Sequence, residues 1–318
     1  MAHSLAPTPL NLRRRFGLFL ARMIMALFVL VERLRPSPPP PSTISLHRYG
    51  LDDAETIQYI PRRSRSAERA PVVFIHGGGW IIGKKELYTR ELFFLAEAGH
   101  PVFNVEYPPA PENRHPGILL SLWHALHWIR RKHPSVDAVH LMGDSAGGNL
   151  AMMLGIISAN PHLLKDLDHG SVTDAPLGCC SVVSLYGVLD RLSWREHGFP
   201  GADLMLACYG GEAALEETVG PALSITPMDL EFETHPPSFL IAGSRDRLGE
   251  STRICAKRLE AGTGIVTSKI YEGESHGFFN MSWRPASLEL KRDVLGFLEA
   301  HDPLGAVDIL GERTRAMT

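Results

Sequence analysis

Short apolar runs alternate with longer helical patterns along most of this chain. The apolar runs are rich in β-branched and aromatic residues, which is typical of strands buried on both faces. Six runs of this kind are predicted to be strands: 72–75, 102–105, 139–142, 181–186, 238–242 and 266–271. The intervening segments with helical character are 86–98, 118–132, 146–157 and 287–300. This alternation predicts a mainly parallel sheet covered by helices on both faces, an α/β fold.

The alternation is interrupted once, for some fifty residues between Tyr186 and Pro236. A connection of that length needs structure of its own, so we expect an inserted, partly helical lid. The predicted organisation is therefore a core of residues 43–186 and 236–301, a lid of residues 187–235, and a frayed tail of residues 302–318.

The first 42 residues form a separate segment. Three arginines, Arg13 to Arg15, precede an apolar run that contains Arg22 and ends before the proline-rich spacer 36–41. The charge in the middle argues against a membrane-spanning helix, and no small-residue cleavage site follows as in a signal peptide. Helical spacing instead gives one apolar stripe: Phe16, Leu20, Met23, Ile24, Leu27, Leu30, Val31 and Leu34. We expect this stripe to pack on the lid, the alternative being peripheral contact with a membrane surface.

Composition excludes several classes of function. The 318 residues carry 32 Lys and Arg against 35 Asp and Glu, a net charge of −3, so no basic surface for nucleic acid is predicted. The four cysteines include no C-x-x-C pair, which favours buried reduced thiols and a cytoplasmic setting. His124 and His127 share a helical face without a third ligand or an H-E-x-x-H pattern. We therefore expect no metal site and no cofactor.

The sequence Gly143-Asp144-Ser145-Ala146-Gly147 carries the clearest chemical signal. It is a G-x-S-x-G motif between a predicted strand and a predicted helix, the setting of a nucleophile elbow. The glycines allow a tight turn that lifts the serine hydroxyl above the sheet. Ser145 is therefore the predicted nucleophile.

A second motif, His76-Gly77-Gly78-Gly79-Trp80, directly follows the first predicted strand of the core. Consecutive glycines let backbone N–H groups turn toward a developing negative oxygen. Neither G-K-[ST] nor G-x-G-x-x-G follows, so a nucleotide-binding loop is not indicated. Trp80 is a candidate for the wall of the substrate pocket.

A serine nucleophile needs a base and an acid, which follow it in the order acid, then histidine, in this topology. Asp246 comes just after a predicted strand, and His276 lies in the loop after the last one. Asp302 comes after the histidine and fails on order, while Glu274 is too close along the chain to reach behind the ring. We therefore predict Asp246 as the acid and His276 as the base.

Between residues 70 and 300 the chain resembles the hormone-sensitive-lipase family of α/β-hydrolase esterases. The resemblance rests on the HGGGW motif, on Gly143-Asp144-Ser145-Ala146-Gly147-Gly148-Asn149, and on His276-Gly277-Phe278. It implies an α/β-hydrolase fold with a helical cap, and an oxyanion hole made by the backbone N–H groups of Gly78, Gly79 and Ala146. The chain departs from the family pattern at Arg247, where the family usually has proline after the acid.

The resulting prediction is a serine hydrolase that cleaves carboxylic esters, small or lipid-like, through an acyl-enzyme and without a metal. Two alternatives stay open. One is an amidase or formamidase with the same triad, and the other is a non-catalytic small-molecule receptor on the same fold. The acyl length, the alcohol and the oligomeric state are not predicted.

Overall fold

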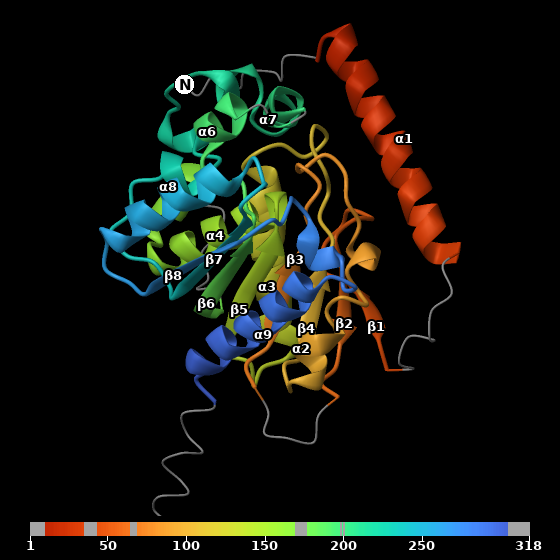
Figure 1. The fold of residues 1–318 in the computed structure, drawn as a ribbon, viewed down its shortest axis with the longest axis vertical. Coiled ribbons are helices and arrows are strands. Elements are labelled where there is room, and N and C mark those ends of the chain that lie inside the picture. Colours follow the sequence, from red (N-terminus) through yellow and green to blue (C-terminus); the bar gives the residue numbers. More distant parts are fainter. Residues whose placement is uncertain are drawn as a thin grey trace, which may run out of the picture.

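A computed structural model describes residues 10–34, 43–63, 69–168, 177–197, 199 and 201–304. The proline-rich spacer and the last fourteen residues of the predicted tail lie outside these ranges. Figure 1 shows a layered core crossed by one twisted sheet, with α1 (Leu12–Leu34) standing along its edge.

One eight-stranded sheet forms the centre, in the order β1-β2-β4-β3-β5-β6-β7-β8. All strands from β4 to β8 in this order run parallel, and β2 and β1 are antiparallel additions at one edge. The strands are β1 (Ser45–Arg48), β2 (Thr56–Ile60), β3 (Val72–Ile75), β4 (Val102–Val105), β5 (Ala138–Asp144), β6 (Gly178–Leu185), β7 (Ser238–Gly243) and β8 (Val266–Tyr271). The six predicted strands and the α/β-hydrolase fold are confirmed. The edge pair β1 and β2 was not predicted.

Helices cover both faces because side chains alternate along each buried strand. In β3, Val73 packs into the cluster that contains α3 (Gly117–Lys132), α4 (Ala146–Ala159) and α8 (Gly249–Glu260). Its neighbour Phe74 packs on the opposite face, against α2 (Phe93–Glu97) and α9 (Pro285–Ala300). A further short helix, α5 (His162–Asp168), follows α4.

The helix predicted over 86–98 is longer than the one in the structure. The structure has a short 3-10 turn, Lys85–Leu87, and then α2. Side-chain contacts fix the stretch between them, because Tyr88 donates a hydrogen bond to Asp144 and Lys291 pairs with Glu91. These contacts hold the chain in an irregular path that a helix could not follow.

The segment 187–235 contains α6 (Arg191–Glu196), α7 (Ala202–Gly210) and the 3-10 turns Glu212–Leu215, Pro221–Leu223 and Pro227–Asp229. A buried arginine connects these pieces: Arg191 pairs with Asp229 at 3.0 Å and donates to backbone carbonyls of Ala214, Glu216 and Glu217. Such a charge is stable in the interior only when all its donors are satisfied. Its contacts make the insertion one packed unit above the carboxyl ends of the strands (Figure 1).

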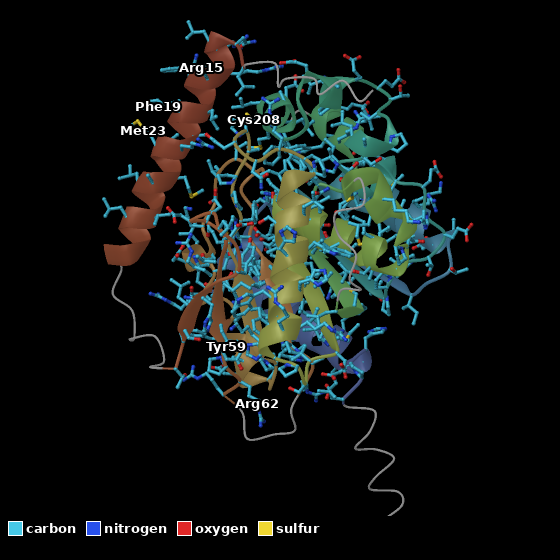
Figure 2. All side chains as sticks on the ribbon, turned by 180° about the vertical axis from the view of Figure 1, so that it is seen from behind. Arg15, Phe19, Met23, Tyr59, Arg62 and Cys208 are labelled. Atoms are coloured by element: carbon cyan, nitrogen blue, oxygen red, sulfur yellow. The ribbon has the colours of Figure 1, made fainter. Side chains whose placement is uncertain are left out.

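The prediction that the apolar stripe of α1 packs on the lid is wrong. Its described members are between 46% and 65% exposed: Phe16, Leu20, Met23, Ile24, Leu27 and Leu30. The side chains of Val31 and Leu34 lie outside the described residues. Another face holds the helix, with Leu18 buried, Gly17 close to Leu204 of α7, and Arg22 bound to Glu112. Figure 2 shows Phe19 and Met23 on the side of α1 away from the body.

Candidate active site

Ser145 occupies the turn between β5 and α4. Its φ of 51° and ψ of −119° are strained for a residue with a Cβ, and its N–H is held by the carbonyl of Leu185 at 2.8 Å. Strain of this kind persists only where surrounding contacts impose it, and it occurs at functional sites. The turn presents the serine at the carboxyl end of the central strand, where open α/β sheets bind ligands.

The flanking glycines are required by space. A Cβ at Gly147 would lie 2.0 Å from the carbonyl oxygen of Ile75, and one at Gly143 would lie 2.3 Å from that of Gly147. Both distances are far inside van der Waals contact with backbone that cannot yield. The strand, turn and helix can therefore approach this closely only with glycine at both positions.

The structure brings Ser145, His276 and Asp246 together. His276 Nε2 lies 3.1 Å from Ser145 Oγ, and His276 Nδ1 lies 2.9 Å from Asp246 Oδ2. The other oxygen of Asp246 accepts the N–H of Leu248 at 2.9 Å, and its carboxylate is fully buried. The imidazole is thus oriented between a fixed acid and a hydroxyl, as general-base catalysis requires.

The other acids considered for the triad make different contacts. Glu274 pairs with Arg284, and Asp190, which also follows a predicted strand, caps the start of α6 by accepting the N–H of Ser193. Asp302 is buried near the start of β3, where it accepts the N–H of Ala70. Asp302 is therefore an ordered part of the core rather than the first residue of a frayed tail, which corrects the predicted boundary.

The glycine loop lies beside Ser145 with its backbone in unusual conformations. Gly78 and Gly79 have φ values of 113° and 57°, and Trp80 follows with 61°. In the described residues, no backbone hydrogen bond is donated by Gly78, Gly79 or Ala146, and the N–H of Ala146 belongs to the free first turn of α4. The three predicted oxyanion donors are thus free to donate to a ligand oxygen.

Asp144 fixes the glycine loop to the elbow. Its Oδ1 accepts the N–H of Gly77 at 2.7 Å and its Oδ2 accepts the hydroxyl of Tyr88 at 3.0 Å. Burial raises the pKa of this carboxyl to about 6, although both hydrogen bonds favour the charged form. These contacts hold the elbow and the neighbouring glycine loop together.

Trp80 joins the glycine loop to the insertion. Its ring stacks on Tyr209 of α7 with centroids 4.6 Å apart and meets Trp194 of α6 edge-on at 5.8 Å. The side chain is completely buried. Tyr209 and Trp194 enclose Trp80 in this conformation, and its role in the wall of the substrate pocket stays a prediction.

Two residues of the insertion reach the site that sequence reasoning did not identify. The ring of Phe199 contacts that of His276 at 5.2 Å, and Met205 of α7 covers Gly79 so closely that a Cβ there would lie 2.3 Å from its sulfur. The sequence predicted only a partly helical lid in this region. That prediction does not tell which residues face the glycine loop.

Comparison with known proteins agrees with this geometry. Residues 72–280 match the model of an α/β-hydrolase-fold family, which is well over half of the chain. The chain belongs to this family of α/β-hydrolases. The resemblance to the hormone-sensitive-lipase group is thereby confirmed. The matched range includes both glycine motifs and all three members of the predicted triad.

Among relatives in this family, esterase LipC of Mycobacterium tuberculosis is 25% identical over 243 residues, which are 72% of this chain and 58% of LipC. The chain thus spans less than two thirds of that relative. Carboxylesterase NlhH of M. tuberculosis is 25% identical over 280 residues, covering 79% of this chain and 81% of NlhH. The first of these relatives is named as an esterase and the second as a carboxylesterase.

A solved structure of inhibited esterase B from Lactobacillus rhamnosis superimposes with a TM-score of 0.77 at 22% identity. The match covers 95% of this chain and 99% of that one. A hyperthermophilic esterase from Pyrobaculum calidifontis gives a TM-score of 0.68 at 21% identity, over 92% and 99% of the two chains. At these identities the likeness establishes the family fold.

Proposed function

We propose that this α/β-hydrolase cleaves carboxylic esters, with Ser145 as nucleophile, His276 as base and Asp246 as the orienting acid. The observation that carries the proposal is the continuous pair of hydrogen bonds from serine to histidine to buried aspartate. The esterase names of family members support the choice of bond.

The reaction follows from the arrangement of the proton donors and acceptors. Ser145 Oγ attacks the ester carbonyl while His276 Nε2 takes its proton, and Asp246 stabilises the imidazolium that forms. The N–H groups of Gly78, Gly79 and Ala146 donate to the developing oxyanion. His276 then returns the proton to the leaving alcohol, and water repeats the sequence on the acyl-enzyme.

Two other activities use the same fold. An amidase would need the same triad. Comparing turnover of ester and amide substrates of equal acyl length distinguishes it from an esterase. A receptor would bind its ligand without turnover, but the intact serine–histidine–aspartate contact supports catalysis. Covalent labelling by a serine-reactive organophosphonate separates a catalyst from a receptor.

The decisive experiment is the Ser145→Ala variant with p-nitrophenyl esters of two to sixteen carbons. Loss of a triad serine costs on the order of 10⁶ in kcat, while the oxyanion hole retains a small residual rate. Phosphonate labelling should disappear together with the activity. A folded variant that kept more than a small fraction of either would remove Ser145 from its role.

The acid is tested by comparing two aspartates. Asp246→Asn should lower kcat by roughly 10⁴, because an amide cannot hold His276 in the required tautomer. Asp302→Asn, assayed at 25 °C, should leave kcat close to that of the parent chain. A large loss at Asp302 with little loss at Asp246 would reverse the assignment.

We further propose that the outward face of α1 rests on a membrane surface. Apolar side chains cover this face along its length, and Arg13 and Arg15 are exposed at its start, where they can meet anionic headgroups. The inner face is already used by Arg22 and Leu18. Among the described residues, α1 included, no helix combines the length and hydropathy needed to cross a bilayer.

A further inference from the structure

Three side chains with metal-ligating atoms converge at the amino ends of the parallel strands, opposite the end that holds the active site. They are His100, which lies just before β4, His140 in β5, and Asp302 just after α9. One ligand atom from each lies within 4.8 Å of the other two, and all three residues are buried. Their separation along the chain explains why sequence spacing predicted no metal site.

The hydrogen bonds of both histidines direct one nitrogen into the cluster. His100 Nδ1 lies 2.7 Å from the carbonyl oxygen of Ala70, so it carries the proton and leaves Nε2 as a lone-pair donor. His140 Nδ1 lies 2.8 Å from Ser181 Oγ, a hydroxyl that can accept its proton, and in that tautomer Nε2 is also a lone-pair donor. An imidazole whose far nitrogen is held by an oxygen is the usual arrangement of a metal-bound histidine.

Two groups in this cluster lack the partner that burial requires. His140 Nε2 is buried and makes no hydrogen bond within the described part of the chain. The carboxylate of Asp302 accepts the N–H groups of Ala70 and Leu304, but no Lys or Arg of the described residues forms an ion pair with it. A buried ring nitrogen without a partner and a buried carboxylate held only by N–H groups are both costly, and a bound cation would satisfy both.

We propose that His100, His140 and Asp302 bind one divalent first-row transition metal ion. Two imidazoles and one carboxylate suit Zn²⁺ and Fe²⁺ rather than Mg²⁺ or Ca²⁺, which prefer oxygen ligands. Ligands about 2.0–2.1 Å from Zn²⁺ in a tetrahedron are roughly 3.4 Å apart, so a small inward movement of the three side chains closes the site. A water molecule would supply the fourth ligand.

The metal would act on stability rather than on ester cleavage. His140 and Ser145 are at opposite ends of β5, and five residues of strand span roughly 16 Å. The three ligands instead join the end of α9 to the starts of β4 and β5. The ion would therefore fix α9 to the amino ends of the strands, at the end of the sheet opposite the triad.

The test uses the full chain, stripped with a chelator and then titrated with Zn²⁺. Isothermal titration should show one tight equivalent per chain, and thermal unfolding should shift upward by about 5 °C at saturating metal. Elemental analysis of protein purified without chelator should find a transition metal. Failure of Zn²⁺, Fe²⁺ and Co²⁺ to bind or stabilise the stripped chain would overturn the proposal.

Variants identify the site of binding. Asp302→Asn and His100→Gln should each lose the metal-dependent shift, measured against the metal-free form of the same variant, so that any loss of intrinsic stability cancels. The matched control is His235→Gln, another buried histidine, whose ring nitrogens lie near the carbonyls of Pro236 and Leu259. It should be less stable yet keep the full shift. Retention of the shift in both ligand variants would mean that Zn²⁺ binds elsewhere and would refute the site.

Discussion

At the scale of single residues, Asp144 holds parts of the site together, and its burial makes ionisation of its own carboxyl less favourable. The carboxyl is buried behind the nucleophile, where it joins the N–H of Gly77 to the hydroxyl of Tyr88. Desolvation exceeds the benefit of these hydrogen bonds, so its pKa rises from 3.8 to about 6. The glycine loop is therefore anchored to a group that titrates near neutral pH.

This shift predicts a pH-dependent stability with a definite sign. The folded chain retains the Asp144 proton between pH 4 and 6, where the unfolded chain has released it, so the free energy of unfolding should fall as pH rises through this window. About two pKa units correspond to about 3 kcal/mol, and no further change is expected above pH 6.

Urea unfolding at pH 4, 5, 6 and 7 measures this effect by comparing the parent chain with Asp144→Asn. Titrations of other groups cancel in the difference between the two proteins. The free energy of unfolding of the parent chain minus that of the variant should fall by about 3 kcal/mol as pH rises. A difference that stayed flat, or that rose with pH, would show that Asp144 is not held protonated by burial.

The triad was predictable because its order along the chain is tied to strands with clear patterns. Ser145, Asp246 and His276 each follow a predicted strand, and parallel strands bring their carboxyl ends to one edge. Phe199 and Met205 could not be predicted in the same way, because their positions depend on how an irregular insertion folds over the edge. The surroundings of Trp80 could not be predicted for the same reason, since its partners Tyr209 and Trp194 lie in that insertion.

At the scale of elements, α1 depends on polar contacts more than its apolar composition suggests. Arg22 donates to both carboxylate oxygens of Glu112, at 2.8 and 2.6 Å, and to the carbonyl of Ala110 at 3.0 Å. Helical periodicity predicted the apolar stripe. It could not tell which face of α1 meets the body, because the ion pairs Arg22–Glu112 and Arg14–Glu212 take the place of apolar contacts.

Removing this anchor should loosen the helix. Arg22→Ala leaves Glu112 without its partner. For a half-exposed ion pair the lost binding free energy is on the order of 1 kcal/mol, which raises the fraction of detached helix about fivefold. Chymotrypsin should then cut faster at Phe16 and Phe19, with the rate followed by mass spectrometry. Arg13→Ala removes the same charge from an exposed position and should leave the cutting rate unchanged. Equal rates in all three proteins would show that Arg22 does not hold α1.

The sheet itself was largely predictable, apart from its edge. The five strands from β3 to β7 are mostly buried runs, which carry a strong signal, whereas β8 at the other edge is largely half-buried or exposed. By contrast, β1 alternates between half-buried and exposed residues, and Leu46 in it is 64% exposed. A short edge strand of this kind is specified by its pairing with β2 and leaves little mark in the sequence.

At the scale of the whole molecule, α1 begins at the end of the fold that holds the insertion and runs down the side of the body (Figures 1 and 2). Gly17 of α1 approaches Leu204 of α7, and Met205, the next residue, covers the glycine loop. A membrane in contact with α1 would therefore be near the part of the insertion that covers the site. This arrangement suits esters that partition into lipid.

The resulting prediction concerns binding to vesicles. The full chain should co-sediment with vesicles containing phosphatidylglycerol and more weakly with pure phosphatidylcholine, since Arg13 and Arg15 favour anionic lipid. The double variant Ile24→Glu, Leu27→Glu should lose most binding, because it places two charges in the apolar face. Leu51→Glu, which alters a leucine that is 98% exposed on another surface, is the matched control and should bind like the parent chain.

A truncated chain that begins at Ser42 separates the membrane role from a role as a cap. If α1 serves as a membrane contact, truncation should abolish vesicle binding and leave kcat/KM for short soluble esters within about twofold, because the helix supplies no group to the triad.

Sedimentation velocity of the parent chain tests whether a second copy of the chain covers the exposed face of α1. A stable dimer that dissociates in the Ile24→Glu, Leu27→Glu variant, without vesicle binding by the parent, would show that a second copy of the chain covers α1 instead of lipid.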